Sequence, residues 1–222
     1  MPRTRLRRLP ERQVDDRLAL DSLLDEALVA HVGVVVEGQP VVLPTAFARD
    51  GDRLLLHGST GSGWMRSAAA GAPACVTVTL LDGLVVARSA FESSMRYRSA
   101  VIFGVLDRLP SEERDRALEL LTDKLLPGRR GELRASTRSE QRRTMVLSMP
   151  LACWSLKVSD GWPEDSEEDR AGPAWAGLVP LRLAADPPVA APDLEAEVPL
   201  PASVEAFVAG RNLPGPHPDP GS

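Results

Sequence analysis

Two short segments of the chain combine residue types that bind phosphorylated ligands. The first, His57-Gly-Ser-Thr-Gly-Ser62, lies between a predicted strand and a predicted helix. Glycines free the backbone there, and hydroxyl and N–H groups at such a place suit a phosphate. His57 is positioned to donate to a bound ligand or to act as an acid–base group. The alternatives are a plain connecting loop and a structural histidine, because neither a Walker motif nor a dinucleotide fingerprint is present.

The second segment, Ser93–Ser99, places two arginines beside the only tyrosine of the chain. In an extended strand, Arg96 and Arg98 project from one face, while Tyr97 and Ser99 project from the other. Arginine holds anionic groups through forked, charge-assisted hydrogen bonds, so this segment is a candidate anion-binding strand. The alternative is a solvent-facing strand whose arginines are paired with Asp or Glu.

The predicted helix after the glycine-serine loop begins with Trp64, Met65 and Arg66. Packing of Trp64 and Met65 beneath the loop is the structural interpretation, and contact of Met65 with a cofactor is the functional one. Arg66 is a cation close to the loop in sequence, so it is a candidate for neutralising a bound phosphate.

Other site chemistries have little support. No Ser-His-Asp order, pair of catalytic carboxylates or activated cysteine is evident. Cys75 and Cys153 stand alone, which suits core packing in a reducing cytoplasm. His31, His57 and His217 are far apart in sequence, so we expect no zinc site and assign no metal ligands.

Composition narrows the functional classes further. The 222 residues are 43% hydrophobic and 26% charged, as in ordinary globular proteins. Residues 1–12 are basic and residues 160–222 are acidic, while residues 13–159 are balanced and aromatic residues are few, which argues against nucleic-acid binding. The longest uncharged run, Ser67 to Leu81, is too short to span a membrane. We therefore expect a cytoplasmic protein.

The candidate residues must be positioned by a β-rich framework. The spacing of Leu20, Leu23 and Leu24 predicts an amphipathic helix that starts at Asp16 and ends before His31. Short β-branched runs divided by turn residues then predict strands. These strands cover residues 31–37, 40–48, 52–57, 74–81 and 84–91.

Three dipeptides predict the turns of this meander. Gly38-Gln39 fits a two-residue turn with glycine first, and Asp50-Gly51 and Asp82-Gly83 favour type I′ turns. Links this short exclude parallel crossovers, so the strands are expected to be antiparallel.

The second half of the chain adds fewer and longer elements. Residues 95–106 predict a longer strand, and Ser111 is expected to cap a helix that Gly128 ends. Residues 144–158 supply one or two closing strands. Six or more antiparallel strands with two or three helices predict a closed or partly closed barrel.

Five segments, in this order, resemble the pyridoxamine 5′-phosphate oxidase-like flavin-nucleotide-binding proteins. They are residues 31–67 (HVGVVVEGQP through GSGWMRS), LLDGLVVARSAF, MRYRSAVIFG, LLPGRR and WAGLVPL. The resemblance covers about residues 16–190 and implies a mainly β fold with flanking helices, an antiparallel split β-barrel that binds FMN. It also implies a homodimer with FMN at the subunit interface, and relatedness to nitroimidazole-resistance reductases.

The resemblance assigns roles to both candidate segments. The glycine-serine loop would approach the phosphate or ribityl chain of FMN, and the MRYRS strand would line the site. The resemblance implies His57, Ser59, Ser62, Tyr97, Arg98 and Ser99 as cofactor-binding residues. The motif analysis adds Thr60, Met65, Arg66 and Arg96 to this candidate set. His57 is also the candidate catalytic residue.

The chain departs from the family pattern at three positions. Ser93 and Arg96 stand where histidine and asparagine are common, and Gly63 stands where a basic residue often follows the loop. Charge for the flavin phosphate would then come from Arg66 or Arg96.

The resulting interpretation has three segments and one leading function. We expect a basic disordered arm over 1–15, the split barrel over 16–190 with an acidic linker about 160–172, and a Pro-rich acidic tail over 191–222. The resemblance implies an FMN-dependent oxidoreductase that transfers hydride between a small substrate and flavin N5. The alternatives are a flavin-binding or redox-sensing protein without turnover, and a barrel that binds a deazaflavin or haem.

Overall fold

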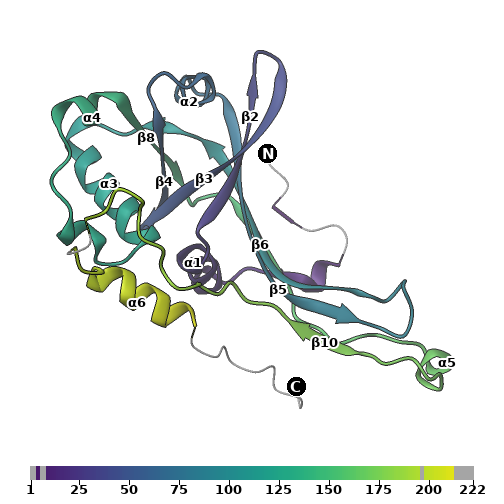
Figure 1. The fold of residues 1–222 in the computed structure, drawn as a ribbon. Helices are drawn as coiled ribbons and strands as arrows, with labels where there is room; N and C mark the ends of the chain where they lie inside the picture. The colour runs from purple at the N-terminus through teal and green to yellow at the C-terminus, as the bar shows by residue number, and fades with distance from the viewer. Residues whose placement is uncertain (1–3, 6–8, 196–197, 213–222) are drawn as a thin grey trace.

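The chain folds around one strongly curved sheet (Figure 1). The structure is a computed structural model that describes residues 4–5, 9–195 and 198–212. Within these residues ten strands form an antiparallel sheet in the order β1-β9-β6-β5-β2-β3-β4-β8-β7, and β10 pairs with β5. The outermost strands of this order do not pair with each other, so the sheet stays open. The predicted antiparallel split barrel with flanking helices is confirmed.

The elements have the following bounds. The strands are β1 (Gln13–Val14), β2 (Val29–Val36), β3 (Gln39–Asp50), β4 (Arg53–Ser59), β5 (Pro73–Val86), β6 (Ser94–Val105), β7 (Asp107–Arg108), β8 (Thr144–Pro150), β9 (Trp154–Ser159) and β10 (Gly177–Pro180). The helices are η1 (Pro10–Arg12), α1 (Arg17–Glu26), α2 (Gly63–Ala69), α3 (Ser111–Leu125), η2 (Arg129–Glu132), α4 (Arg138–Arg143), α5 (Glu167–Arg170) and α6 (Ala202–Arg211). No helix in the described ranges is long and apolar enough to cross a membrane.

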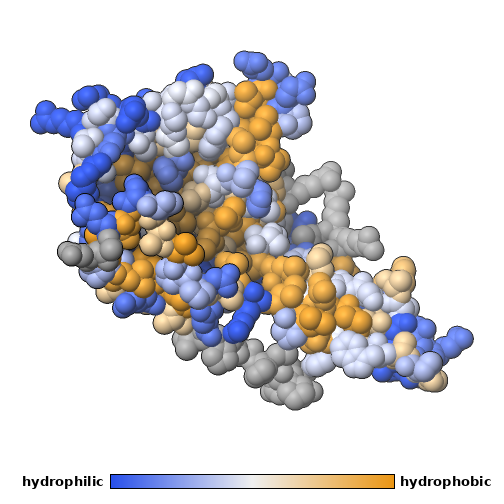
Figure 2. All heavy atoms as spheres, in the orientation of Figure 1, coloured by the Kyte–Doolittle hydropathy of each residue, from blue (hydrophilic) through white to orange (hydrophobic). Residues whose placement is uncertain are grey.

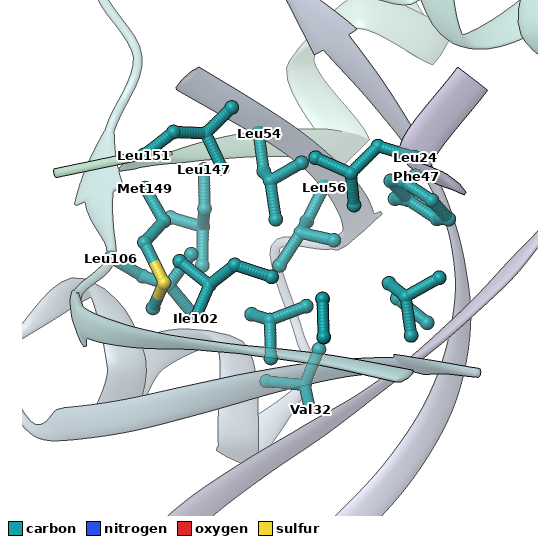
Figure 3. Close-up of a cluster of buried hydrophobic side chains, with 14 of the residues drawn as sticks. Leu24, Val32, Phe47, Leu54, Leu56, Ile102, Leu106, Leu147, Met149 and Leu151 are labelled. Carbon is teal, nitrogen blue, oxygen red and sulfur yellow. The ribbon is translucent and has the colours of Figure 1, made fainter. Parts of the chain in front are cut away.

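The main core fills the inside of the curved sheet. α1 contributes Leu20, Leu23 and Leu24, all fully buried, as the helical spacing predicted. Asp16 caps this helix, because its carboxylate accepts a hydrogen bond from the Leu18 N–H at 2.9 Å. Figure 3 shows side chains from β2, β4, β6 and β8 meeting in the same cluster.

A second, smaller core lies on the outer face of β4 and β8. Leu54 and Leu56 of β4 point into the main core, whereas Leu55 between them points the other way. There it packs with Val146 of β8 and with Ala117 of α3. This explains three consecutive buried leucines: β4 is covered on both faces, by the main core and by α3.

The predicted hairpin at Asp82-Gly83 is wrong. β5 runs without interruption from Pro73 to Val86, and the dipeptide sits at a register shift between Leu81 and Gly83. A β-carbon on Gly83 would lie 3.0 Å from the Val179 carbonyl oxygen of β10. The glycine therefore permits the close approach of a neighbouring strand and does not form a turn.

The other two predicted hairpins exist, with shifted turn residues. The β2–β3 turn is Glu37-Gly38, and both residues have positive φ, as a type I′ turn requires. The β3–β4 turn is Gly51-Asp52, one residue later than predicted. Ser111 is likewise the first residue of α3 and not its cap, since Pro110 occupies the N-cap position.

The two ends of the chain are more ordered than predicted where the structure describes them. The expected disordered arm over 1–15 is wrong for residues 10–14, because η1 leads into β1, which pairs with β9. The predicted Pro-rich acidic tail contains α6, whose Ser203 donates a hydrogen bond to Glu132 at 2.6 Å. The remaining parts of these predictions, residues 1–3, 6–8, 196–197 and 213–222, lie outside the described residues.

One end of the sheet projects from the body as an arm. It consists of the end of β5, the start of β6, β10 and α5 (Figure 1). Its tip is held by the buried carboxylate of Asp165, which accepts hydrogen bonds from the Arg88 backbone N–H and guanidinium at 2.7 and 2.8 Å. Figure 2 shows hydrophobic side chains gathered on the visible face of this arm. Exposed apolar residues there include Leu84, Met95, Trp175 and Val179.

Candidate functional site

The glycine-serine loop is a tightly bonded connection between β4 and α2. The Ser62 N–H donates to the Ser59 carbonyl at 3.0 Å, and the Gly61 N–H donates to the Ser59 hydroxyl at 3.1 Å. The Thr60 N–H donates to the Arg143 carbonyl at 3.0 Å. The loop is therefore fixed by its backbone, and in the described part of the chain the Thr60 and Ser62 hydroxyls carry no hydrogen bond. These two hydroxyls are free for a ligand.

Met65 forms the foundation of this loop. Its side chain is fully buried in the main core. A β-carbon on Gly58 would lie 3.2 Å from the Met65 Cγ and 3.3 Å from its Sδ, so the glycine lets the strand end pass close over the methionine. The packing interpretation accounts for Met65, and its contact with a cofactor stays a prediction.

Arg66 lies against the loop from the exposed side. Its Nη1 donates a hydrogen bond to the Gly61 carbonyl at 2.6 Å. In the described chain no carboxylate pairs with this guanidinium, so it presents a positive charge beside the two free hydroxyls. The sequence expected a cation here, and the structure places one at the loop itself.

His57 precedes the loop on the outer face of β4. It is opposite Val146 in β8, on the same face as Leu55 and therefore toward α3. Its Nδ1 is buried and has no hydrogen-bond partner within the described residues. Burial lowers the pKa of His57 below its usual 6.5, so the ring is neutral at neutral pH. A neutral imidazole with one unsatisfied nitrogen can donate to or accept from a ligand.

The second candidate segment is the predicted extended strand. Arg96 and Arg98 share their face of β6 with Ala100 and Ile102, which are fully buried, so both arginines project toward the inside of the sheet. Tyr97 projects from the opposite, outer face. The strand thus divides the predicted residues between its two faces.

Arg98 is neutralised by acidic side chains. Its guanidinium donates to Asp82 of β5 at 2.8 and 3.0 Å and to Glu26 of α1 at 2.6 and 3.1 Å. These hydrogen bonds, to Asp82 and then to Glu26, raise the pKa of Arg98 above its usual value. All three guanidinium nitrogens are occupied, as in the structural alternative, and a role of Arg98 in cofactor binding stays a prediction.

Arg96 differs from its neighbour. It is half-buried opposite Gly83 and has neither an ion pair nor a hydrogen bond with the rest of the described chain. An unpaired, partly buried guanidinium is an available anion contact. Of the two arginines, Arg96 is the one whose donors are free.

On the outer face of β6, a cation that the motif analysis did not consider accompanies the tyrosine. Lys157 of β9 is opposite Ser99, and its Nζ lies 5.8 Å from the centre of the Tyr97 ring. The Ser99 and Thr79 hydroxyls are 2.7 Å apart on the same face. Lys157 is one of two lysines in the chain, which was the available signal, but only the strand pairing brings it to Tyr97.

The structure assembles each segment but does not bring the two together. The loop adjoins α2, at the top of Figure 1, whereas Arg98 is bonded to the C-terminal end of α1 in the middle of the view. β4 and β6, which carry the segments, are separated in the sheet by three strands. The loop set and the strand set are therefore two part-sites within one chain.

The loop fits a phosphate-bearing aromatic cofactor. It offers two free hydroxyls, the guanidinium of Arg66, and a neutral histidine with an orphaned buried nitrogen. Such a set suits a phosphate and the polar edge of a ring system better than a metal, because the described residues contain no cluster of metal-binding side chains.

The open, curved antiparallel sheet with its flanking helices is the split-barrel fold that the sequence resemblance implied. The chain belongs to the pyridoxamine 5′-phosphate oxidase family, whose model matches residues 16–158. This confirms the resemblance noted from the sequence. No curated protein sequence matches the chain.

Two solved structures are similar along almost the whole chain. One is an FAD and haem binding protein from Mycobacterium smegmatis, 50% identical, with a TM-score of 0.85 over 88% of this chain and 96% of that one. The other is the flavocytochrome Anf3 from Azotobacter vinelandii, 35% identical, with a TM-score of 0.87 over 93% and 96%. A candidate 5-nitroimidazole antibiotic resistance protein from Bacteroides thetaiotaomicron shares the fold at 24% identity, with a TM-score of 0.57 over 66% and 86%.

Proposed function

We propose that the chain is a flavin-dependent oxidoreductase that acts as a homodimer. The observation that carries this proposal is its 50% identity, over 88% of the chain, to a protein that binds FAD and haem. The donor set of the glycine-serine loop supports it, because hydroxyls, a guanidinium and an orphaned histidine nitrogen match the needs of a flavin nucleotide.

Each part-site has a role in this proposal. Thr60, Ser62 and Arg66 bind the phosphate or ribityl chain, and His57 orients the ring or holds a proton at Nδ1. Arg96 supplies charge for an anionic group. A bound flavin would supply hydride chemistry, and the protein would supply binding, orientation and electrostatics.

Two copies of the chain are needed because one chain keeps the part-sites apart. The outer face of the sheet, which would meet the partner, carries exposed apolar residues such as Val35, Val42 and Leu81. On β2 and β5 these exposed positions alternate with buried core positions, as in a sheet that is packed on both faces. A dimer through this face would place Tyr97 and Lys157 of one copy near the other copy.

Absorption spectroscopy of the purified protein tests the cofactor. We expect a yellow protein with two flavin bands, and boiling should release a flavin that mass spectrometry identifies. The sequence resemblance favours FMN, and the 50% identical relative favours FAD, so the released mass decides between them. A colourless protein that takes up neither flavin contradicts the proposal. Light scattering should give twice the chain mass.

Turnover needs a separate experiment. Anaerobic addition of NAD(P)H or pyridoxamine 5′-phosphate should bleach the flavin bands if the protein is an oxidoreductase. Unchanged bands with every reductant would favour the alternative, a flavin-binding or redox-sensing protein without turnover.

Haem binding is a second candidate function. It is favoured by the two most extensively matched structures described above, an FAD and haem binding protein and a flavocytochrome. His31 is exposed on the outer face of β2 and is a possible axial ligand. A Soret band in protein reconstituted with haem, lost in His31→Ala, would establish it. Reconstitution without a Soret band would exclude it and leave the flavin proposal intact.

A further inference from the structure

A cavity of about 290 Å³ lies beside the loop-bearing strand pair, on the face covered by α3. It forms where β7 and the start of α3 pack against the first residues of β8. Its polar lining comes from Arg108, Ser111, Arg114 and Thr144, and its apolar wall includes Leu109 and Val146. No acidic side chain lines it.

The two arginines of this cavity are unpaired, in contrast to Arg53 and Arg116. Arg53 and Arg116 are close by in the fold, and each forms an ion pair with Asp50 at 2.8 and 3.0 Å. Arg108 and Arg114 have no ion pair and no hydrogen bond within the described chain. The positive charge here therefore lacks the carboxylate partner that Arg53 and Arg116 have.

Arg114 shows most directly that a partner is missing. Its Nε is buried and has no hydrogen-bond acceptor, one of only three such side-chain nitrogens found in the described residues. A buried N–H donor without an acceptor is costly, and native proteins usually satisfy such groups with protein, water or a bound ion. Arg114 also lines the cavity, and the rest of its guanidinium has no partner in the described chain, so it can donate to an anion bound there.

We propose that this cavity binds a phosphate-class anion. Two guanidinium groups hold a phosphate or diphosphate by forked, charge-assisted hydrogen bonds. The volume accommodates a small phosphorylated group, and the absence of acidic lining residues excludes a cation site.

The anion can come from two sources that share this chemistry. One is a free phosphate or diphosphate ion. The other is the diphosphate of a dinucleotide such as FAD, since Thr144 at the cavity is the strand partner of Ser59 in the glycine-serine loop. The second source rests on the flavin proposed above, whereas the first does not.

Calorimetric titration of the purified full chain with inorganic pyrophosphate tests the site. Wild type should bind pyrophosphate, and Arg114→Gln should lower the affinity about tenfold, the loss expected for one charge-assisted hydrogen bond. The control is Arg116→Gln, on the same helix but paired with Asp50, which should bind as wild type does. No binding by wild type at millimolar pyrophosphate, or an equal loss in the control, overturns the proposal.

A second variant guards against misfolding of the first. Arg108 is exposed in the two-residue strand β7, so Arg108→Gln should fold normally, shown by an unchanged circular dichroism spectrum, and should also lose pyrophosphate affinity. Well-folded Arg108→Gln and Arg114→Gln that both keep wild-type affinity would refute the assignment.

Titration with FMN and FAD then identifies the source. Weaker binding of FAD but not FMN in both variants identifies the dinucleotide diphosphate, and unchanged binding of both flavins identifies a free anion. A chain that binds no flavin fails the proposed function, while the pyrophosphate titration still decides the anion site.

Discussion

The glycine-serine loop and the β6 segment contain similar residue types but differ in how those residues are satisfied. In the loop, backbone hydrogen bonds and the packing of a buried methionine fix the structure. The hydroxyls, Arg66 and the His57 nitrogen therefore remain available. In β6, the guanidinium of Arg98 donates hydrogen bonds to Asp82 and Glu26, and only the guanidinium of Arg96 has free donors. The comparison shows that residue type alone does not tell which side chains keep free hydrogen-bonding groups for a ligand.

Removal of the foundation of the loop should have the largest effect. Met65→Ala deletes a fully buried side chain, so the free energy of unfolding should fall by about 2–5 kcal/mol. Urea denaturation measures this loss. Met95→Ala is the matched control, because Met95 is 49% exposed and its replacement should change stability by less than about 0.5 kcal/mol. Equal losses would show that the loop has no special foundation.

Replacement of the two arginines of β6 should weaken flavin affinity to different extents. Arg96→Gln should weaken flavin affinity about tenfold, since it removes a free guanidinium, and Arg98→Gln should weaken it less. Flavin fluorescence titration gives both dissociation constants. A larger loss in Arg98→Gln would reverse the comparison and restore the role that the family resemblance gives to Arg98.

The same two substitutions should have the opposite order of effect on the free energy of unfolding. Arg98→Gln leaves Asp82 and Glu26 without their partner, and because these groups are partly exposed the cost should be about 1 kcal/mol. Arg96→Gln breaks no described interaction and should cost less. Thermal unfolding of the two variants, side by side, measures the difference.

Burial of His57 should make the stability of the protein depend on pH, with a smaller effect than the substitutions above. The pKa of His57 is lowered in the folded state, so below about pH 6.5 the unfolded chain binds a proton that the folded chain resists. Stability should therefore fall as pH drops from 6.5, and this part of the fall should be absent in His57→Gln. Urea midpoints between pH 7.5 and 5 test this, and identical pH profiles for the two proteins would contradict it.

The sequence predicted those parts of the fold that depend on local pattern. Leucine spacing predicted α1, and β-branched runs predicted most strands. Both patterns arise because the side chains of one element that face the core recur at a fixed spacing along the sequence. The turn predicted at Asp82-Gly83 does not form, for a reason that lies outside this dipeptide. Its turn chemistry is overridden by Arg98, which binds Asp82, and by β10, which needs Gly83 to be small. Both arrive from distant parts of the chain.

The sequence identified candidate residues for the site but not how their side chains pair in space. Strand alternation placed Arg96 and Arg98 on one face, as expected. It could not show that Glu26, 72 residues away, neutralises one and not the other, or that Lys157 comes to lie beside Tyr97. Such pairings depend on sheet order and helix placement, which no local pattern contains.

The short strand β10 has a consequence for the solubility of the protein. β2 pairs with β5 only over residues 74–77, and β10 occupies residues 83–86 on the arm. Without β10, a row of free backbone N–H and C=O groups beside exposed Leu84 would be open to strands of other molecules, which is how sheets nucleate aggregates. A chain cut before Gly177 should therefore precipitate at concentrations at which the full chain stays in solution. We therefore expect β10 to protect this stretch of β5 from edge-to-edge pairing with strands of other molecules.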